Sequence, residues 1–261
     1  MRHPLIATIL ILAAVIFSPQ IGQAQQPQLP ALKPLPAAPI KPYPAVAVTP
    51  PAALDDPSFV ALRKQMLDAA AHKDRAALAK LVVAQGFFWM QDKDLADKRK
   101  SGIANLASAV ALDAQDGPGW RVLAAFADDP SAAESPQQKG VFCAPADPAV
   151  DSNAIEALAK ETGTDPFEWA YPSKGGADVH AAAQPNSPVI DKLGMNLVRV
   201  LADTAQPENP NEPFFVHVAT PTGKTGFVNS QALSPLAGDQ ICYVKEASGW
   251  KITGIIGGAT Q

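Results

Sequence analysis

The sequence predicts an α+β fold, in which a helical domain precedes a small all-strand domain of the β-barrel type. Two observations carry this prediction. Between residues 55 and 168, apolar residues recur at helical spacing. From residue 169 onward, short β-prone runs alternate with clusters of turn residues, which is typical of barrels and sandwiches rather than of a parallel sheet.

Residues 1–24 have the pattern of a secretory signal peptide. Arg2 precedes an uncharged apolar run from Leu5 to Phe17, and Gly22 and Ala24 place small residues where a signal peptidase reads. The run is too short to cross a bilayer core, which needs about 20 residues. We therefore expect cleavage after Ala24, a periplasmic or secreted protein, and no stable membrane span after cleavage.

Residues 25–54 are expected to form a proline-rich linker. Between Gln25 and Ala52 the chain holds nine prolines and only two charged residues, Lys33 and Lys41. Because proline has no backbone N–H to donate, such a segment favours an extended, polyproline-like spacer over helix or sheet.

Residues 55–168 are rich in alanine and are expected to form a helical domain. Asp56-Pro57 marks the start of a helix that runs to about Ala71, and Asp74 can cap a second helix. Further helices are expected at 95–112, 120–126 and 154–160, the last of them capped from 151–153. The aromatic run 87–89 is interpreted as part of the core of this domain.

Residues 169–261 are expected to form the barrel domain, with a hairpin at its end. The β-prone runs 214–218 and 226–228 are separated by a short loop that contains Gly223, which is a hairpin signal. A second hairpin is expected from 241–244 and 250–252, which flank the turn residues 247–249.

Four short motifs in this domain resemble the bacterial SH3-like (SH3b) repeat. The residues that carry the resemblance are Asp178-Val179-His180-Ala181, Ser187-Pro188-Val189-Ile190, Leu193-Gly194 and Gly223-Lys224-Thr225-Gly226-Phe227-Val228. His180 stands where the repeat has Arg, and Phe227 stands where it has Trp. The segment 203–213 is an insert where the repeat has a short loop. The resemblance implies an SH3-like β-barrel and a role in binding, and the motifs cover about a quarter of the chain.

We select the candidate ligand-binding residues by their expected position in this barrel. Exposed loops and a strand edge are where such a module would contact a ligand, and the aromatic and imidazole side chains available there can stack and hydrogen-bond. The residues expected to contribute are His180, Phe215, His217 and Phe227.

The chain has two cysteines, Cys143 and Cys242. Because a signal peptide delivers the protein to an oxidising compartment, a disulfide between them is the expected state. The alternative is that Cys143 acts as a nucleophile, with His180 or His217 as the base that generates its thiolate.

Composition and motif content exclude several classes of function. The formal net charge is −4 at pH 7 and basic residues form no cluster that would hold nucleic acid. Histidines are few and far apart in the sequence, so no metal site is expected. Gly223-Lys224-Thr225 lacks both the upstream glycine and the following helix of a phosphate loop, and no cofactor is expected.

We therefore expect an exported, non-catalytic binding or scaffold protein of the bacterial envelope, whose SH3-like module contacts cell-wall peptidoglycan or an envelope protein. One alternative is a cell-wall hydrolase that uses Cys143 as nucleophile. Another is an architectural protein that assembles through its helices. The oligomeric state, the identity of the ligand and the role of the insert 203–213 stay open at this point.

Overall fold

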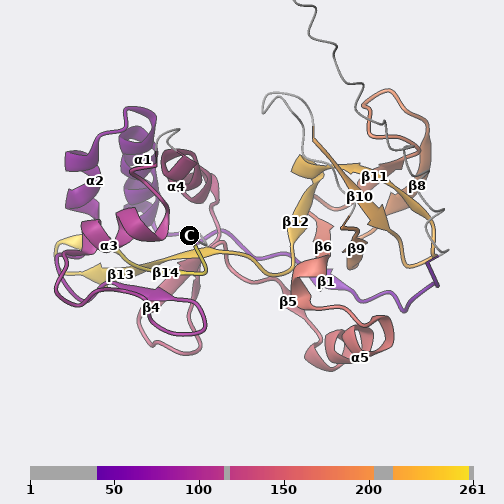
Figure 1. Ribbon diagram of the computed structural model, residues 1–261, viewed down its shortest axis with the longest axis horizontal. Coiled ribbons are helices and arrows are strands. Elements are labelled where there is room, and N and C mark those ends of the chain that lie inside the picture. The colour runs from indigo at the N-terminus through magenta and orange to yellow at the C-terminus, as the bar shows by residue number, and fades with distance from the viewer. Residues whose placement is uncertain (1–39, 115–117, 203–213, 259–261) are drawn as a thin grey trace, which may run out of the picture. The chain divides into compact units, whose positions relative to one another are not determined.

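The computed structural model describes residues 40–114, 118–202 and 214–258. The expected signal peptide, most of the expected linker and the insert 203–213 lie outside this part of the chain. The described residues form five α-helices and three β-sheets (Figure 1). The helices are α1 (Pro57–Ala71), α2 (Arg75–Leu81), α3 (Gly102–Ala109), α4 (Pro118–Asp128) and α5 (Ser152–Thr162).

The strands fall into one small and two larger sheets. The small sheet pairs β1 (Val48–Thr49) with β5 (Ala149–Val150). A five-stranded sheet contains β2 (Phe88–Met90), β3 (Ala133–Glu134), β4 (Val141–Ala144), β13 (Gln240–Glu246) and β14 (Gly249–Ile256). A seven-stranded sheet contains β6 (Trp169–Pro172), β7 (Ala177–His180), β8 (Val189–Leu193), β9 (Val198–Val200), β10 (Phe215–Ala219), β11 (Thr225–Asn229) and β12 (Leu233–Pro235).

Capping residues set the helix starts that the sequence predicts. Asp56 accepts a hydrogen bond from the Ser58 backbone N–H at 2.8 Å, with Pro57 in the first turn of α1. The carboxylate of Asp56 also accepts a hydrogen bond from Lys245, which holds the pKa of Asp56 well below its usual range. Asp74 caps α2 in the same way. The predicted cap at Asp56, the proline at the start of α1 and the predicted cap at Asp74 are therefore confirmed.

The helix expected at 95–112 is much shorter in the structure, where α3 begins only at Gly102. Asp94 accepts hydrogen bonds from the backbone N–H groups of Trp89 and Ala96, and Asp97 accepts one from Arg99. Such local side-chain bonds offer the backbone an alternative to helix and hold this stretch in turns. The helix at 95–112 was expected from the spacing of apolar residues, and that spacing carries no information about these side-chain hydrogen bonds.

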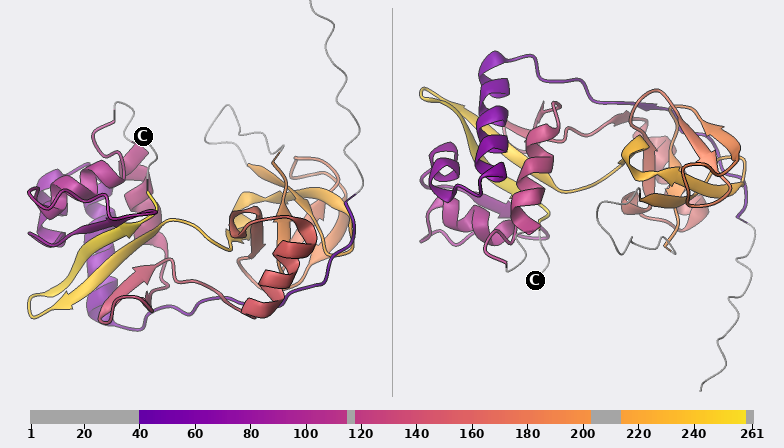
Figure 2. Two further views of the ribbon diagram at one scale, coloured as in Figure 1. Left: turned by 60° about the horizontal axis from the view of Figure 1, so that its bottom comes forward. Right: turned by 90° about the horizontal axis from the view of Figure 1, so that it is seen from above.

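The C-terminal hairpin β13–β14 lies in the five-stranded sheet, whose order is β2-β14-β13-β4-β3. Strand β13 pairs antiparallel with β14 and β4, and β14 pairs parallel with β2. The hairpin lies against α1 (Figure 2), where the ring of Phe59 makes edge contacts with Tyr243 and Trp250 at centroid distances of 5.0 and 5.3 Å. Helices and hairpin therefore share one hydrophobic core.

The expected fold class, a separate helical domain followed by a barrel, is wrong for this reason. Phe59, Leu78 and Leu123 of the helices and Ile241 and Ile252 of the hairpin are fully buried in a single cluster. A helix or a sheet has one apolar face that must be covered by another element. The alanine-rich helices cover theirs with a sheet whose strands come from residues 88–144 and 240–256.

The seven-stranded sheet has the order β12-β6-β9-β10-β11-β7-β8. One of its faces buries an apolar cluster made of Ala170, Val179, Leu193, Val198, Val218 and Val228. The opposite face, which we call the outer face, is covered over β6 and β9 by α5 and by residues 43–48. Leu158 of α5, Tyr43, Trp169 and Leu197 are buried there together.

Part of the segment expected as linker thus packs on this sheet. Tyr43 is 6% exposed, and its hydroxyl donates to the backbone carbonyl of Ala219 at 2.6 Å. The backbone of 46–48 continues the contact, since the Leu197 N–H donates to the carbonyl of Val46 and the Val48 N–H to that of Met195. The prolines of this segment lie on either side of residues 46–48, so these residues keep the backbone N–H groups that pairing requires.

The expectation of a closed β-barrel is also wrong. Strands β12 and β8 stand at opposite ends of the strand order and do not pair with each other. In β12, Pro235 has no N–H to offer a further strand, and proline in a sheet is confined to edges and strand ends for this reason. The apolar side chains of this sheet pack against one another in the buried cluster described above.

Candidate functional site

The four residues expected to bind a ligand come together in the structure. His180 on β7, Phe227 on β11 and His217 on β10 are direct cross-strand partners in adjacent strands. Phe215 precedes His217 by two residues on β10 and so faces the same way. We call His180, Phe215, His217 and Phe227 the imidazole–phenyl cluster.

Ring contacts connect the members of the imidazole–phenyl cluster. The rings of His217 and Phe227 are stacked, with centroids 4.7 Å apart and planes inclined by 15°. The rings of His180 and Phe215 meet edge to face at 5.8 Å. Phe215 is buried, whereas the other three side chains are partly exposed. The cluster therefore presents two imidazoles and one phenyl ring to solvent above a buried phenyl ring.

Strand alternation places the cluster on the outer face. Val179, Gly226 and Val228 are the sequence neighbours of its members, and they point to the other face, where Val179 and Val228 are fully buried. Gly226 is required where β7 and β11 approach. A Cβ atom there would lie 2.5 Å from a Val179 methyl group and 2.7 Å from the His180 carbonyl oxygen.

Hydrogen bonding defines the tautomer of His180. Its Nδ1 lies 2.9 Å from the backbone carbonyl oxygen of Ser187. A carbonyl only accepts hydrogen bonds, so Nδ1 carries the proton, and in the neutral ring Nε2 is left as an acceptor. The Ser187 hydroxyl in turn accepts from the Ala182 N–H at 2.8 Å and holds the loop after β7 in place. His180 thus offers a ligand one oriented acceptor.

The cross-strand row that contains His180, Phe227 and His217 extends to the edge of the sheet. Val189 on β8 is the partner of His180, and its side chain is 46% exposed. A peptide that crosses this row would meet apolar, imidazole and phenyl surfaces in turn. Such a surface can stack on rings, attract cations above the phenyl face and accept hydrogen bonds.

The predicted disulfide between Cys143 and Cys242 is confirmed. The two residues are direct partners on the antiparallel strands β4 and β13, with their Cα atoms 4.0 Å apart. Both are buried. The sulfur of Cys143 is bonded and therefore carries no thiolate, while His180 and His217 lie in a different sheet. This arrangement does not support Cys143 as a nucleophile.

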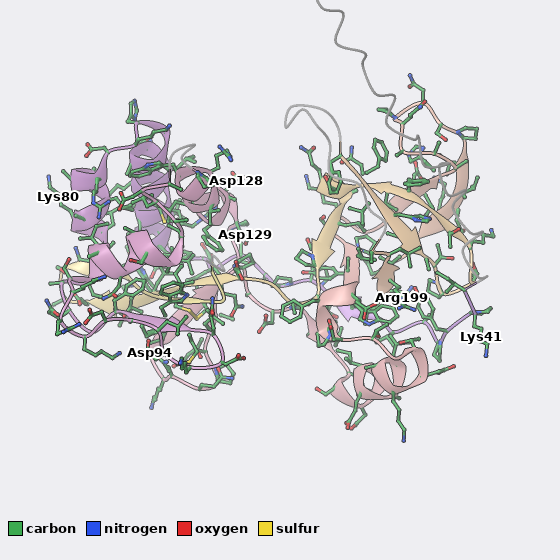
Figure 3. All side chains as sticks on the ribbon, in the orientation of Figure 1. Lys41, Lys80, Asp94, Asp128, Asp129 and Arg199 are labelled. Carbon is green, nitrogen blue, oxygen red and sulfur yellow. A yellow bond between two sulfur atoms is a disulfide. The ribbon has the colours of Figure 1, made fainter. Side chains whose placement is uncertain are left out.

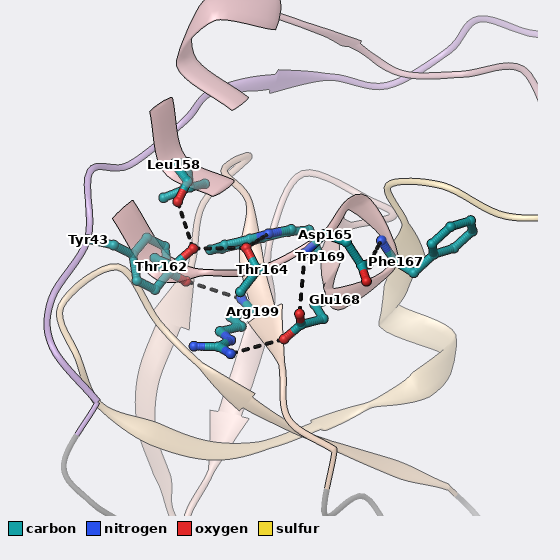
Figure 4. A network of polar contacts seen from close by, with 9 residues as sticks. All are labelled: Tyr43, Leu158, Thr162, Thr164, Asp165, Phe167, Glu168, Trp169 and Arg199. Atoms are coloured by element: carbon teal, nitrogen blue, oxygen red, sulfur yellow. Dashed lines mark hydrogen bonds and ion pairs between the residues drawn. The ribbon is translucent and has the colours of Figure 1, made fainter. Parts of the chain in front are cut away.

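Next to the cluster lies a polar network that the sequence analysis missed (Figure 4). On the outer face Arg199 of β9 forms an ion pair with Glu168 at 3.0 Å, and its backbone N–H donates to the hydroxyl of Tyr43. Burial raises the pKa of Tyr43 well above its usual range, so this hydroxyl stays protonated and can donate as well. No sequence motif links these residues, which are brought together by the fold.

Other chemistry is limited in the described residues. There, no three His, Cys, Asp or Glu side chains gather as a metal site would require, and no helix is long and apolar enough to span a membrane. Asp128 and Asp129, labelled in Figure 3, lie at the end of α4 and just after it. Asp129 has a local role, since its carboxylate accepts hydrogen bonds from the N–H and the hydroxyl of Ser131.

Comparison of the chain with models of protein families, with curated proteins and with solved structures finds no match. The resemblance to SH3-like repeats therefore depends on the motif residues alone. Those residues lie on β7 and just after it, on β8 with the residues that flank it, and on β11 with the preceding turn.

Proposed function

We propose that this protein is an exported, non-catalytic binding protein of the cell envelope that holds a peptide through the imidazole–phenyl cluster. One observation carries the proposal: four residues selected by sequence position lie together on one face of three adjacent strands. The disulfide supports the compartment, because such bonds persist in oxidising surroundings outside the cytoplasm.

The ligand that we propose is the peptide part of peptidoglycan. Its amide N–H groups can donate hydrogen bonds to the oriented Nε2 acceptor of His180. The phenyl ring of Phe227 would contact its aliphatic carbons. Three partly exposed side chains form a small contact, so we expect weak binding.

Co-sedimentation with purified sacculi tests the proposal. We expect the full mature chain to pellet with sacculi, and Phe227→Leu to reduce the bound fraction, because leucine keeps the apolar contact but loses the stacked ring. His180→Asn keeps a donor toward the Ser187 carbonyl and removes the Nε2 acceptor, and it should weaken binding similarly.

The matched control is Phe167→Ala, which removes an exposed phenyl ring from another part of the chain. It should leave the bound fraction unchanged. A wild-type protein that stays in the supernatant at both low and moderate salt would rule out peptidoglycan as the ligand. Equal loss in all three variants would show that binding is unrelated to the cluster.

A further inference from the structure

A groove of about 610 Å³ lies at the open edge of β12, and we call it the β12 groove. Its volume is typical of pockets that hold small molecules. More of its lining is apolar than polar, and the apolar part includes Tyr171, Leu233 and the prolines Pro50, Pro145 and Pro235. It contains no member of the imidazole–phenyl cluster.

Five charged side chains line the β12 groove, and four of them are carboxylates. The aspartates are Asp128, Asp129, Asp147 and Asp239, and the one cation is Lys174. The lining therefore has a net charge of −3 at pH 7. None of the five forms an ion pair with another residue in the part of the chain that the structure describes. The negative charge of the groove is thus left for a ligand to compensate.

The ionised form of Asp147 is poorly compensated by the protein. Partial burial raises the pKa of its carboxyl, and the hydrogen bond that it accepts comes from the neutral amide of Gln240, at 3.1 Å. Burial also raises the pKa of Tyr171, and the charges of Asp129 and Asp147 raise it further, so both carboxylates lie near this ring. A cation bound there would interact with two carboxylates and with the face of a phenol ring.

The free edge of β12 offers hydrogen-bond acceptors without donors. Ala232 and Leu236 form backbone hydrogen bonds to β6 and the residue after it, so strand alternation turns the carbonyl groups of Leu233 and Pro235 toward the free edge. Pro235 has no N–H, and the N–H of Leu233 donates to the carbonyl of Ser230. A peptide cannot add here as a further strand, because that needs N–H groups from both partners. A ligand rich in N–H donors can use the carbonyl groups.

The arrangement of the carboxylates does not suit a metal ion. Among the residues that the structure describes, no three His, Cys, Asp or Glu side chains gather as a metal site requires. The four aspartates come instead from three separate stretches of the chain, 128–129, 147 and 239, with apolar walls between them. A ligand whose positive groups are separated by methylene groups matches both features.

We propose that the β12 groove binds a linear aliphatic polyamine. Its ammonium groups would donate to the carboxylates and to the edge carbonyl groups, and its methylene groups would pack against Leu233 and the prolines. The proposal uses no residue of the imidazole–phenyl cluster. Polyamine binding and the proposed peptide binding are therefore separate properties, and either can fail without the other.

Isothermal titration calorimetry of the full mature chain with spermidine, a linear triamine, tests the proposal. Saturable binding is expected at low salt, and the affinity should fall between about 10 mM and about 1 M salt, where the Debye length shrinks from about 30 to about 3 Å. Asp128→Asn and Asp239→Asn, which alter exposed carboxylates of the groove, should each weaken binding by about fivefold. The double variant should lose about 25-fold if the two sites act independently.

The matched control is Glu156→Gln, which removes one exposed carboxylate from α5, outside the groove, and should leave the affinity unchanged. Octanediol, an uncharged aliphatic chain, should not bind. Absence of spermidine binding at low salt, an equal loss of affinity in Glu156→Gln, or equally tight binding of octanediol overturns the proposal. Tighter binding of tetralysine than of spermidine would assign the groove to a basic peptide and overturn it as well. Circular dichroism checks that each variant is folded.

Discussion

Removal of the disulfide is the perturbation whose magnitude the structure best defines. Cys143 and Cys242 are 99 residues apart in sequence, and a loop of that size corresponds to about 4.7 kcal/mol in the chain-entropy model. Between them the chain builds α5 and all strands of the seven-stranded sheet, which buries apolar clusters of its own.

These clusters set a lower bound on the loss of stability, because they can keep the seven-stranded sheet folded when the five-stranded sheet unfolds. If the seven-stranded sheet stays folded while the five-stranded sheet opens, only the short joins near 145–148 and 237–239 remain flexible. The freed loop then contains roughly 10 residues, for which the same model gives about 3 kcal/mol. We therefore expect Cys143→Ala with Cys242→Ala to reduce the free energy of unfolding of the five-stranded unit by about 3 to 4.7 kcal/mol.

Urea denaturation followed by tryptophan fluorescence measures this loss. Trp89, Trp120 and Trp250 are buried in the core shared by the helices and the five-stranded sheet, whereas Trp169 belongs to the other sheet. In a Trp169→Phe background the signal reports on the first core alone. If the double alanine variant and the unreduced parent had the same denaturation midpoint, the reasoning would be refuted.

Three further predictions concern stability. Gly226→Ala should destabilise the seven-stranded sheet by about 1 to 3 kcal/mol through overpacking against Val179, measured by urea denaturation, and Gly238→Ala, whose Cβ would meet no atom closer than 3.6 Å, should be neutral. Tyr43→Phe should lower the free energy of unfolding of the seven-stranded sheet by about 1 kcal/mol or more, because a buried carbonyl loses its donor; an unchanged midpoint would contradict this. Because the folded-state pKa of Asp56 lies below its ordinary value of about 3.9, its stabilisation is present above that pH and is lost as the pH falls. The melting temperature of Asp56→Asn should therefore be lower at pH 7 and decline less steeply below pH 4 than that of the wild type, and identical slopes would contradict the assignment.

Local signals determined much of the secondary structure. Asp56-Pro57 and Asp74 mark helix starts because a cap is formed within three residues, and the hairpin β10–β11 follows from β-prone runs around Gly223. The disulfide could be predicted because the chain has two cysteines and a leader-like start. The sequence indicated which four residues belong to the imidazole–phenyl cluster, but not that their side chains lie on the same face of the sheet. Its shared face depends on the pairing register between β7, β10 and β11.

What the sequence by itself determined is therefore short-range: caps, turns, strand-forming runs and a pair of thiols. Only the tertiary structure decided which sheet the last hairpin joins, that the seven-stranded sheet stays open, and that Tyr43 and its neighbours pack on that sheet. The physical reason is that these outcomes depend on how much apolar surface distant segments bury against each other. That quantity belongs to pairs of elements, such as Phe59 with Tyr243, and no stretch of sequence carries it alone.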